Sequence, residues 1–392
     1  MTMDRRDFLL RGTALGCTAA ASPFVTPVAL ASAPWDNRLV VVILRGAMDG
    51  LDVVQPYGDA GLAGLRPDLP SGEAGGGMDL DGFFSMHASL GALSPLWRSG
   101  ELGFVHAVST PYRDKRSHFD GQDLLEAGIG GTSGIRDGWL NRMLQQVPGL
   151  EQEIAYAVGR EQMLILSGDK LVSSWAPGTD LQLGTETQRL LELVQHDDPI
   201  FRAASTDAIR IAAEARDLGN LAGEAVGRGT SVDVARFAAS RLLADTRIAS
   251  FSINGWDTHN QQARGLRQPL EELANTILTL KSSLGDVWSK TAVVCMTEFG
   301  RTARQNGSGG TDHGTAGAML LAGGAVRGGR VVTDWPGLGE ADLYDRRDLM
   351  PTRDVRAHAG WMMRGLFGLP QGTIESAIFP GLEMGGDPGL LL

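Results

Sequence analysis

Short apolar runs alternate with amphipathic stretches along most of the chain. The run Leu39–Leu44 is continuous and mostly β-branched, which is typical of a strand buried on both faces of a sheet. Further strands are predicted at Leu102–Val108, Met163–Ser167, Arg247–Ile253, Lys290–Met296, Met319–Leu321 and Arg330–Val332. Helices are predicted at Ala88–Trp97, through most of Thr185–Leu243, at Gln261–Leu284 and at Pro351–Leu366, the last capped by Asp348 or Thr352. This alternation predicts an α/β fold with a central, mostly parallel sheet sandwiched by helices.

The first 31 residues predict an export signal. Arg5 and Arg6 are adjacent, a weakly apolar stretch follows, and small residues close it at Ala29–Ala31. This order is typical of a twin-arginine signal peptide cleaved after Ala31. We therefore expect residues 32–392 to form a single α/β domain, periplasmic or secreted. Within it, residues 128–234 contain fewer strand-like runs and predict a largely helical insertion.

Composition and charge exclude several classes of protein. The 392 residues carry a formal net charge of −11 and no dense Lys/Arg cluster, which argues against a nucleic-acid partner. Beyond the extreme N-terminus, no apolar run reaches the roughly 20 residues of a membrane-spanning helix. After cleavage only Cys295 remains, so we expect no internal disulfide, and its apolar surroundings predict a buried thiol.

Acidic and imidazole side chains follow several predicted strands at their carboxyl ends, where sites form in open α/β sheets. Asp257 and His259 are two residues apart, so on extended backbone they point to the same side. A carboxylate and an imidazole together suit zinc or another metal that accepts nitrogen ligands. The candidate metal ligands at these strand ends and in the loop after the Lys290–Met296 strand are Asp49, Asp257, His259, Glu298, Asp312 and His313.

Each candidate also has a purely structural interpretation. Asp257 could cap a helix that begins near Asn260, and Asp312 could occupy a turn. Glu298 ends a buried strand and needs either a cation or an ion pair with Arg301. Helix capping after the first strand suits Asp52 better than Asp49.

The segment Arg116–Asp120 combines a cation, a hydroxyl, an imidazole and a carboxylate at a predicted helix start. Helix N-termini favour anions, so a phosphate- or sulfate-like group could bind there with Arg116 as a clamp. The structural alternative is that Ser117 caps the helix. Elsewhere, His106 is expected to be a hydrogen-bonded core histidine and His358 to lie on a helix surface.

Three familiar motifs are missing: the G-x-S-x-G nucleophile elbow, a G-x-G-x-x-G after the first strand, and H-E-x-x-H. Five segments instead resemble the DUF1501 family, namely Leu44–Asp52, Arg116–Asp120, Gly255–His259, Glu298–Arg301 and Gly307–Gly314. That family looks like a branch of the alkaline phosphatase and sulfatase superfamily. The resemblance implies an alkaline-phosphatase-like fold with metals at the strand ends.

The resemblance also implies roles for individual residues. Asp49 would bind one metal, and Asp257, His259 and His313 would bind another. Ser117 is nearest to the expected nucleophile, with Thr110 behind it. The expected catalytic residues are Ser117, His118, Arg116 and Arg301.

Two functions from different classes follow. The first is an exported hydrolase of phosphate or sulfate esters that uses a divalent metal, zinc first, with manganese or calcium as alternatives. Its partner would be a small anionic ester. The second is a non-catalytic binding or assembly protein with a co-exported protein partner. It is motivated by the poor match of Ser117 and Glu298 to the superfamily pattern: the sulfatase Cys-x-Pro-x-Arg and alkaline phosphatase Asp-Ser-Ala motifs are absent, and Glu298 stands where that pattern has an Asp-His pair.

Overall fold

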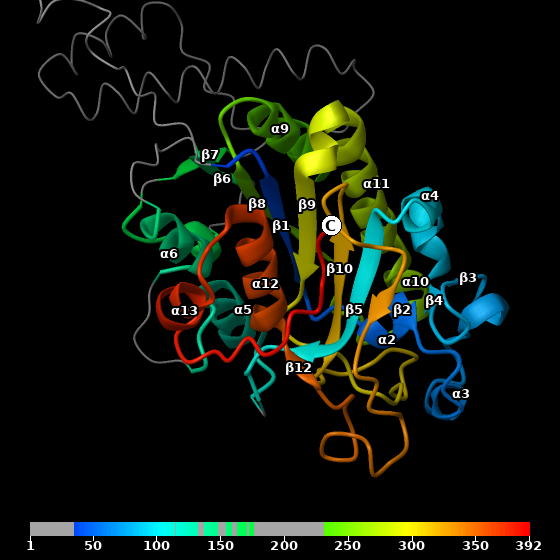
Figure 1. The fold of residues 1–392 in the computed structure, drawn as a ribbon. Coiled ribbons are helices and arrows are strands. Elements are labelled where there is room, and N and C mark those ends of the chain that lie inside the picture. Colours follow the sequence, from blue (N-terminus) through cyan, green and yellow to red (C-terminus); the bar gives the residue numbers. More distant parts are fainter. Residues whose placement is uncertain are drawn as a thin grey trace, which may run out of the picture.

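A large sheet organises the computed structural model, which describes residues 35–113, 115–131, 137–147, 154–158, 163–170, 172–175 and 231–392 (Figure 1). Across the sheet, its strands within these ranges are β11 (Val331–Val332), β5 (Leu102–Ser109), β10 (Gly317–Ala322), β9 (Thr291–Met296), β1 (Arg38–Arg45), β8 (Ile248–Asn254), β6 (Ala155–Val158) and β7 (Ser173–Trp175). A short strand, β12 (Arg353–Asp354), also pairs with β5. A small second sheet consists of β2 (Val54–Gln55), β4 (Ser85–Met86) and β3 (Met78–Asp79).

Strand direction in the large sheet is parallel except at β10. The central strand β1 pairs in parallel with β8 on one side and with β9 on the other. β10 runs antiparallel to both β9 and β5, so β5 has the same direction as β1. The predicted mostly parallel sheet is confirmed, and the carboxyl ends of β1, β5, β8 and β9 meet at one edge.

Helices cover both faces of this sheet (Figure 1). The described α-helices are α2 (Gly50–Val53), α3 (Gly61–Leu65), α4 (Ser94–Arg98), α5 (His118–Ala127), α6 (Trp139–Gln145), α9 (Ser231–Leu243), α10 (Gln262–Gly265), α11 (Arg267–Leu284), α12 (Val355–Phe367) and α13 (Gln371–Thr373). The side chains of β1 alternate between two cores. Val40 and Val42 pack in the core under α9 and α11, while Leu39 and Val41 pack in the core under α6 and α12. Burial on both faces explains why β1 is a continuous apolar run.

Some elements differ from the sequence prediction. Met163–Ser167 contains a 3-10 helix at Leu164–Leu166 and not a strand. α12 begins after Asp354, whose carboxylate accepts the Arg356 N–H, so neither Asp348 nor Thr352 is its cap. His358 is 1% exposed and lies in the core, because it faces the sheet from α12. The predicted signal peptide and most of the predicted helical stretch Thr185–Leu243 lie outside the described residues; only its end, α9, is seen to be helical.

Other predictions about buried residues are confirmed. Cys295 is fully buried, and burial raises the pKa of its thiol. His106 is also buried, and its Nε2 lies 3.0 Å from the carbonyl oxygens of both Gly50 and Val54. Packing explains the Cys295 thiol, and backbone hydrogen bonds together with burial explain His106.

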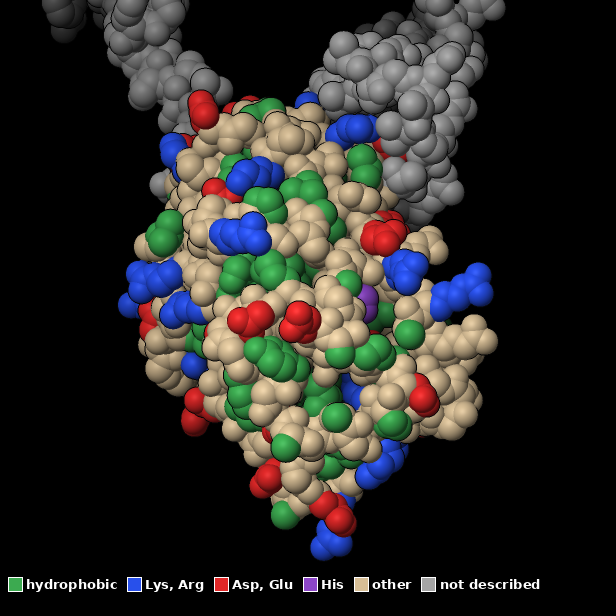
Figure 2. Space-filling view, turned by 90° about the vertical axis from the view of Figure 1, so that its right-hand side faces the viewer, with side chains coloured by type: hydrophobic (Ala, Val, Ile, Leu, Met, Phe, Trp, Pro, Cys, Tyr) green, Lys and Arg blue, Asp and Glu red, His purple; other side chains and the backbone are tan. Residues whose placement is uncertain are grey.

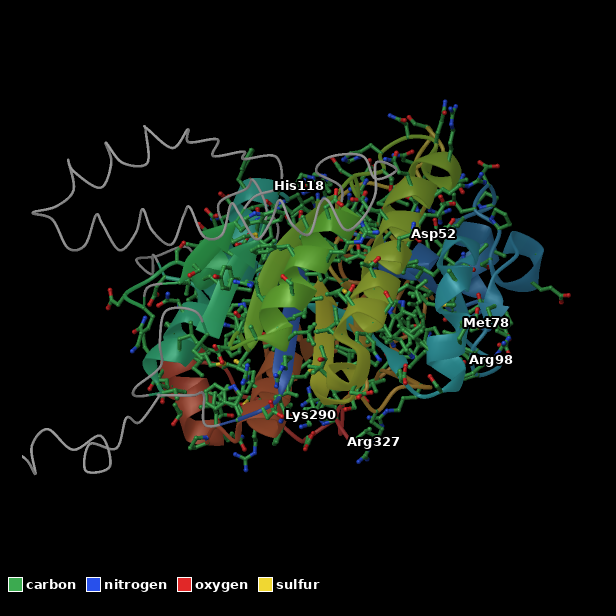
Figure 3. The ribbon with its side chains drawn as sticks, turned by 90° about the horizontal axis from the view of Figure 1, so that it is seen from above. Asp52, Met78, Arg98, His118, Lys290 and Arg327 are labelled. Atoms are coloured by element: carbon green, nitrogen blue, oxygen red, sulfur yellow. The ribbon has the colours of Figure 1, made fainter. Side chains whose placement is uncertain are left out.

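Surface charge is mixed on the face shown in Figure 2, where Lys and Arg side chains are interspersed with Asp and Glu. No helix in the described part of the chain is long and apolar enough to cross a membrane. In Figure 3, His118 lies well away from Lys290 and Arg327, and these two residues lie toward the other end of the strands. The polar cluster described next belongs to the His118 end.

Candidate metal centre

The loops that follow β1, β5, β8 and β9 lie against one another at the carboxyl edge of the sheet. Glycines allow this close packing. A side chain at Gly46, which has φ of +120°, would bring its Cβ within 2.7 Å of the Asp257 backbone nitrogen. A Cβ on Gly310 would lie 2.3 Å from the carbonyl carbon of His259. Both contacts are closer than real Cβ atoms tolerate, so glycine at these positions lets the loops that carry Asp257 and His259 approach their neighbours.

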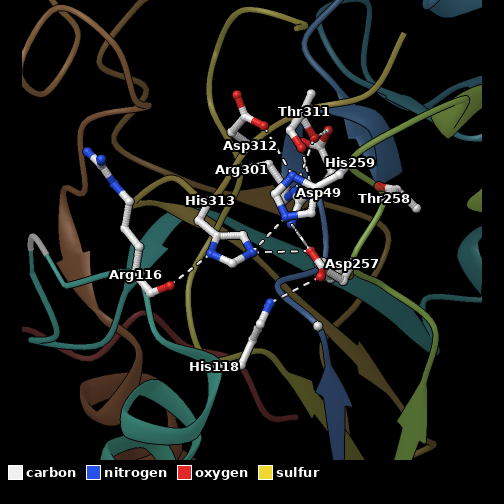
Figure 4. Close-up of polar contacts among 12 residues, drawn as sticks. Asp49, Arg116, His118, Asp257, Thr258, His259, Arg301, Thr311, Asp312 and His313 are labelled. Carbon is white, nitrogen blue, oxygen red and sulfur yellow. Dashed lines mark hydrogen bonds and ion pairs between the residues drawn. The ribbon is translucent and has the colours of Figure 1, made fainter. Parts of the chain in front are cut away.

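Three histidines from different loops converge on one carboxylate at this edge (Figure 4). His118 is the first residue of α5, His259 follows β8, and His313 precedes β10. The Nε2 atoms of His259 and His313 are 2.9 Å apart, and both lie close to Oδ1 of Asp257, at 3.0 and 3.2 Å. The Nε2 atom of His118 is 3.4 Å from Oδ2 of the same carboxylate. Candidate ligand atoms of His118, Asp257 and His313 all lie within 4.8 Å of one another.

The other ring nitrogen of each histidine faces an oxygen that can only accept a hydrogen bond. Nδ1 of His118 is 2.8 Å from Oε1 of Glu298, and Nδ1 of His259 is 3.1 Å from Oδ1 of Asp312. Nδ1 of His313 is 2.9 Å from the carbonyl oxygen of Arg116. Each Nδ1 is therefore placed to donate a proton, so in the neutral form of each imidazole the Nε2 lone pair is directed at the cluster.

This arrangement fits a metal ion better than a hydrogen-bonded cluster. Neutral imidazoles protonated on Nδ1 present only lone pairs to the Asp257 carboxylate, so no proton links them. Histidines that bind metals usually donate their other N–H to a carboxylate or a backbone carbonyl, as all three do here. His118 Nε2 is also buried without a hydrogen-bond partner. His118, His259, His313 and Asp257 are thus the residues that could hold a divalent cation.

Asp257 is ionised because a buried arginine supports it. Partial burial acts to raise the pKa of the Asp257 carboxyl, but the hydrogen bond and charge of Arg301 outweigh it and lower that pKa. Nη1 of Arg301 lies 2.6 Å from Oδ1 of Asp257. Arg301 is only 1% exposed and also donates to the side chain and carbonyl of Thr311. Its guanidinium lies behind Asp257, so the geometry gives Arg301 a positioning role in place of the catalytic role expected from the sequence.

Glu298 lies behind His118 at the end of β9. Burial acts to raise the pKa of its carboxyl, but hydrogen bonds from His118, Gln122 and the Gly46 N–H lower it. Gln122 is one helical turn after His118 on α5 and donates to Glu298 Oε1 at 3.1 Å. Hydrogen bonding to His118, together with the Arg301–Asp257 pair, replaces the Glu298–Arg301 ion pair considered from the sequence. The same hydrogen bond, which His118 donates to Glu298, raises the pKa of His118.

Asp49 lies apart from the imidazoles, and Arg66 binds both of its oxygens, at 2.7 and 3.1 Å. Asp49 is also the N-cap of α2, where it accepts the Leu51 N–H, so the capping role expected for Asp52 belongs to Asp49. Arg66 cannot be recognised from the sequence, since nothing in its spacing from Asp49 marks the two as partners.

The structure brings some of the other expected site residues to the rim and not to the centre. Ser117 caps α5, where its Oγ accepts the Asp120 N–H at 3.4 Å, as in the structural alternative. Arg116 contributes its carbonyl, and its guanidinium points away from the three imidazoles (Figure 4). The carbonyl can face His313 because Arg116 has a φ of +54°. Asp312 contacts His259 from behind and so has a partner beyond its own turn. Asp257 does not cap the helix that follows it, because α10 begins at Gln262 with Gln261 as its N-cap.

The sequence of these loops and strands identifies the family. Residues 107–372, about two thirds of the chain, match the family described as "Protein of unknown function (DUF1501)". The chain belongs to the DUF1501 family. The match covers His118, Asp257, His259, Glu298 and His313, and it ends before the C-terminal turns.

Three solved structures are similar to this DUF1501 protein. A protein in the alkaline phosphatase superfamily from Vibrio parahaemolyticus has 12% identity and a TM-score of 0.38, and the alignment covers 93% of this chain and 76% of that one. The lipoteichoic acid synthase LtaP from Listeria monocytogenes has 7% identity and a TM-score of 0.33, with 70% and 59% covered. The C-terminal periplasmic domain of EcEptC from Escherichia coli, in complex with Zn, has 11% identity and a TM-score of 0.34, with 73% of each chain covered.

No curated protein sequence matches the chain. Because the TM-scores with the solved structures are below 0.5, the interpretation of the site depends on the residues of this chain alone.

Proposed function

We propose that this protein is an exported, metal-dependent hydrolase of phosphate or sulfate esters. The observation that carries the proposal is the convergence of three Nε2 lone pairs on the ionised Asp257. A divalent cation held by His118, His259, His313 and Asp257, zinc before manganese or calcium, would supply Lewis acidity that activates water and stabilises a negatively charged leaving group.

Access to solvent favours a catalytic role over a structural one. Structural zinc sites are closed by protein ligands, whereas catalytic sites keep a position open for water or substrate. The side chains of Asp257 and His259 are 44% and 40% exposed. Water and a small ester can therefore approach the centre from the side of Asp257 and His259.

The residues around the opening suit an anionic substrate and a water nucleophile. Lys115 and Arg116 are exposed beside His118 and add positive charge at the rim. Within the described chain, no serine, threonine or cysteine side chain contacts the three Nε2 atoms, and Ser117 caps a helix. Water is therefore the nucleophile that this arrangement supports best. Arg301 keeps Asp257 ionised, and Glu298 keeps the His118 lone pair directed at the centre.

The proposal is tested by turnover of p-nitrophenyl phosphate and p-nitrophenyl sulfate by the purified protein loaded with zinc or manganese. We expect turnover that a chelator abolishes and that is lost in Asp257→Asn, while Asp354→Asn, which alters the cap of α12 and its ion pair with Arg356, retains it. Turnover that survives both the chelator and Asp257→Asn would exclude this centre as the active site.

The second candidate is a metal-binding protein without catalysis, which has a co-exported protein as its partner. The observation in its favour is the capping role of Ser117, since the residue nearest to the expected nucleophile serves the helix. This candidate predicts tight metal binding with no turnover of either ester.

A further inference from the structure

A second carboxylate at the same edge of the sheet has a guanidinium where a cation would bind. Asp49 follows β1 and is 0% exposed, and Arg66 is 3% exposed. Nη1 of Arg66 lies 2.7 Å from Oδ2 of Asp49, and Nη2 lies 3.1 Å from Oδ1. This is a two-point contact between a planar guanidinium and a carboxylate, the strongest geometry for such a pair.

The remaining hydrogen-bonding capacity of both groups is also used. Arg66 donates to the carbonyl oxygens of Thr302 and Ala303, at 2.8 and 2.9 Å. Asp49 accepts the Leu51 N–H at 3.1 Å and the side-chain amide of Gln262 at 2.6 Å. A metal ion could bind Asp49 only by displacing a buried guanidinium, a group that keeps its positive charge in proteins.

Asp49 is connected to the metal centre through a single threonine. Oγ1 of Thr311 lies 3.1 Å from Nε of Arg301 and 2.7 Å from Oε1 of Gln262, and it lies 3.5 Å from Asp49. Arg301 in turn supports Asp257. The Asp49–Arg66 pair therefore lies in the layer behind the candidate ligands, where its charge acts on the same site.

We propose that Arg66 takes the place of a second metal ion, so that the centre holds one divalent cation. This inference rests on the proposed function. Charge balance supports it: Asp257, Glu298 and Asp312 with Arg301 leave two negative charges beside three neutral imidazoles. One divalent cation neutralises these two charges, and Asp49 already has Arg66 as its ion-pair partner.

The test is the zinc stoichiometry of the purified full chain, measured by equilibrium dialysis and elemental analysis. We expect one equivalent for the wild type, one for Asp49→Asn and none for Asp257→Asn. Thermal unfolding of each variant shows whether it is folded. Two equivalents in the wild type, or loss of zinc in folded Asp49→Asn, would overturn the one-metal inference and leave the metal centre in place.

If Asp49→Asn does not fold, the zinc stoichiometry of the wild-type protein decides the inference by itself, because that measurement needs no substitution. A wild-type value of zero would remove the metal centre and this inference together. Arg66→Lys provides a further check. This variant keeps the positive charge, so we expect it to bind one equivalent of zinc. A second equivalent of zinc would contradict the proposal that the positive charge at position 66 replaces a second metal ion.

Discussion

Two carboxylates at the same edge of the sheet have opposite surroundings. Asp257 follows β8, is 44% exposed on its side chain, and faces three imidazole nitrogens together with one arginine. Asp49 follows β1, is fully buried, and has both oxygens bound by Arg66. Both positions look equally suited to a metal in the sequence, yet only Asp257 lies among lone pairs that need a cation.

The difference shows that a carboxylate after a parallel strand is not by itself a metal ligand. What decides its role is the nearest positive charge that the fold supplies. At Asp49 the fold supplies a permanent guanidinium from α3 and its flanking turn. At Asp257 it supplies Arg301 on one oxygen and leaves the imidazoles on the open side. Variants that exchange or remove these charges should therefore have different effects at Asp49 and at Asp257.

The largest effect is expected at the buried pair. Arg66→Ala leaves Asp49 buried without its counter-charge, which costs about 3–5 kcal/mol of unfolding free energy in comparable cases. Urea denaturation in metal-free buffer measures this loss. Arg346→Ala removes only an exposed pair with Glu340 and should change stability little. Equal effects of the two variants would show that the Asp49–Arg66 pair has no special structural role.

The next effect concerns the imidazoles. His259→Ala removes a proposed ligand, and we expect it to weaken zinc affinity by more than the roughly 10–100-fold that loss of an outer partner causes. Competition with a chromophoric chelator measures the change. His87→Ala is the control, because His87 caps a 3-10 helix outside the cluster. Unchanged affinity in His259→Ala would remove this residue from the centre.

A smaller effect is expected behind His118. Glu298→Gln removes the charge that holds the Nδ1 proton, so zinc affinity at pH 8 should fall roughly 10–100-fold. In the metal-free protein, the raised pKa of His118 should fall toward its ordinary value. Zinc binds neutral imidazole, so affinity in the wild type should decrease as pH falls through this raised pKa. An NMR titration and chelator competition measure both changes; a His118 pKa unaffected by Glu298→Gln would contradict the assigned hydrogen bond.

The smallest effect is expected at a histidine outside both regions. Neither ring nitrogen of His358 has a hydrogen-bond partner, and burial lowers its pKa from 6.5 to about 3. The unfolded chain therefore takes up a proton below pH 6.5 that the folded chain does not, so His358 destabilises the fold as pH falls. Between pH 7 and pH 5 the loss is about 2 kcal/mol.

His358→Leu should reduce the acid sensitivity of the metal-free protein by that amount. Urea denaturation at the two pH values measures it. An unchanged difference between pH 7 and pH 5 in the variant would show that His358 is not a source of the acid sensitivity.

Much of the fold could be predicted from the sequence because its strands are continuous apolar runs. β1, β5, β8, β9 and β10 all lie where such runs predicted them. The antiparallel direction of β10 could not be predicted, because direction depends on how the chain returns to the sheet. The sequence around Leu164–Leu166 predicts a strand where the structure has a 3-10 helix, because a short apolar run has no distinguishing period.

The site could be predicted in part, for a physical reason. Parallel strands bring their carboxyl ends together, so the sequence predicts Asp257, His259 and Glu298 at one edge of the sheet, and they lie there in the structure. The roles within that edge depend on contacts between distant segments. His118, Gln122 and Arg66 reach their carboxylate partners across 180, 176 and 17 residues, and no local spacing encodes these pairs.

The most direct test of the metal centre is anomalous diffraction from crystals of the zinc-loaded protein, recorded on both sides of the zinc absorption edge. We predict one strong anomalous peak between the Nε2 atoms of His118, His259 and His313 and the carboxylate of Asp257, with zinc–nitrogen distances near 2.0–2.1 Å. The absence of a peak at these four residues, or a peak bound to Asp49 instead, would contradict the assignment.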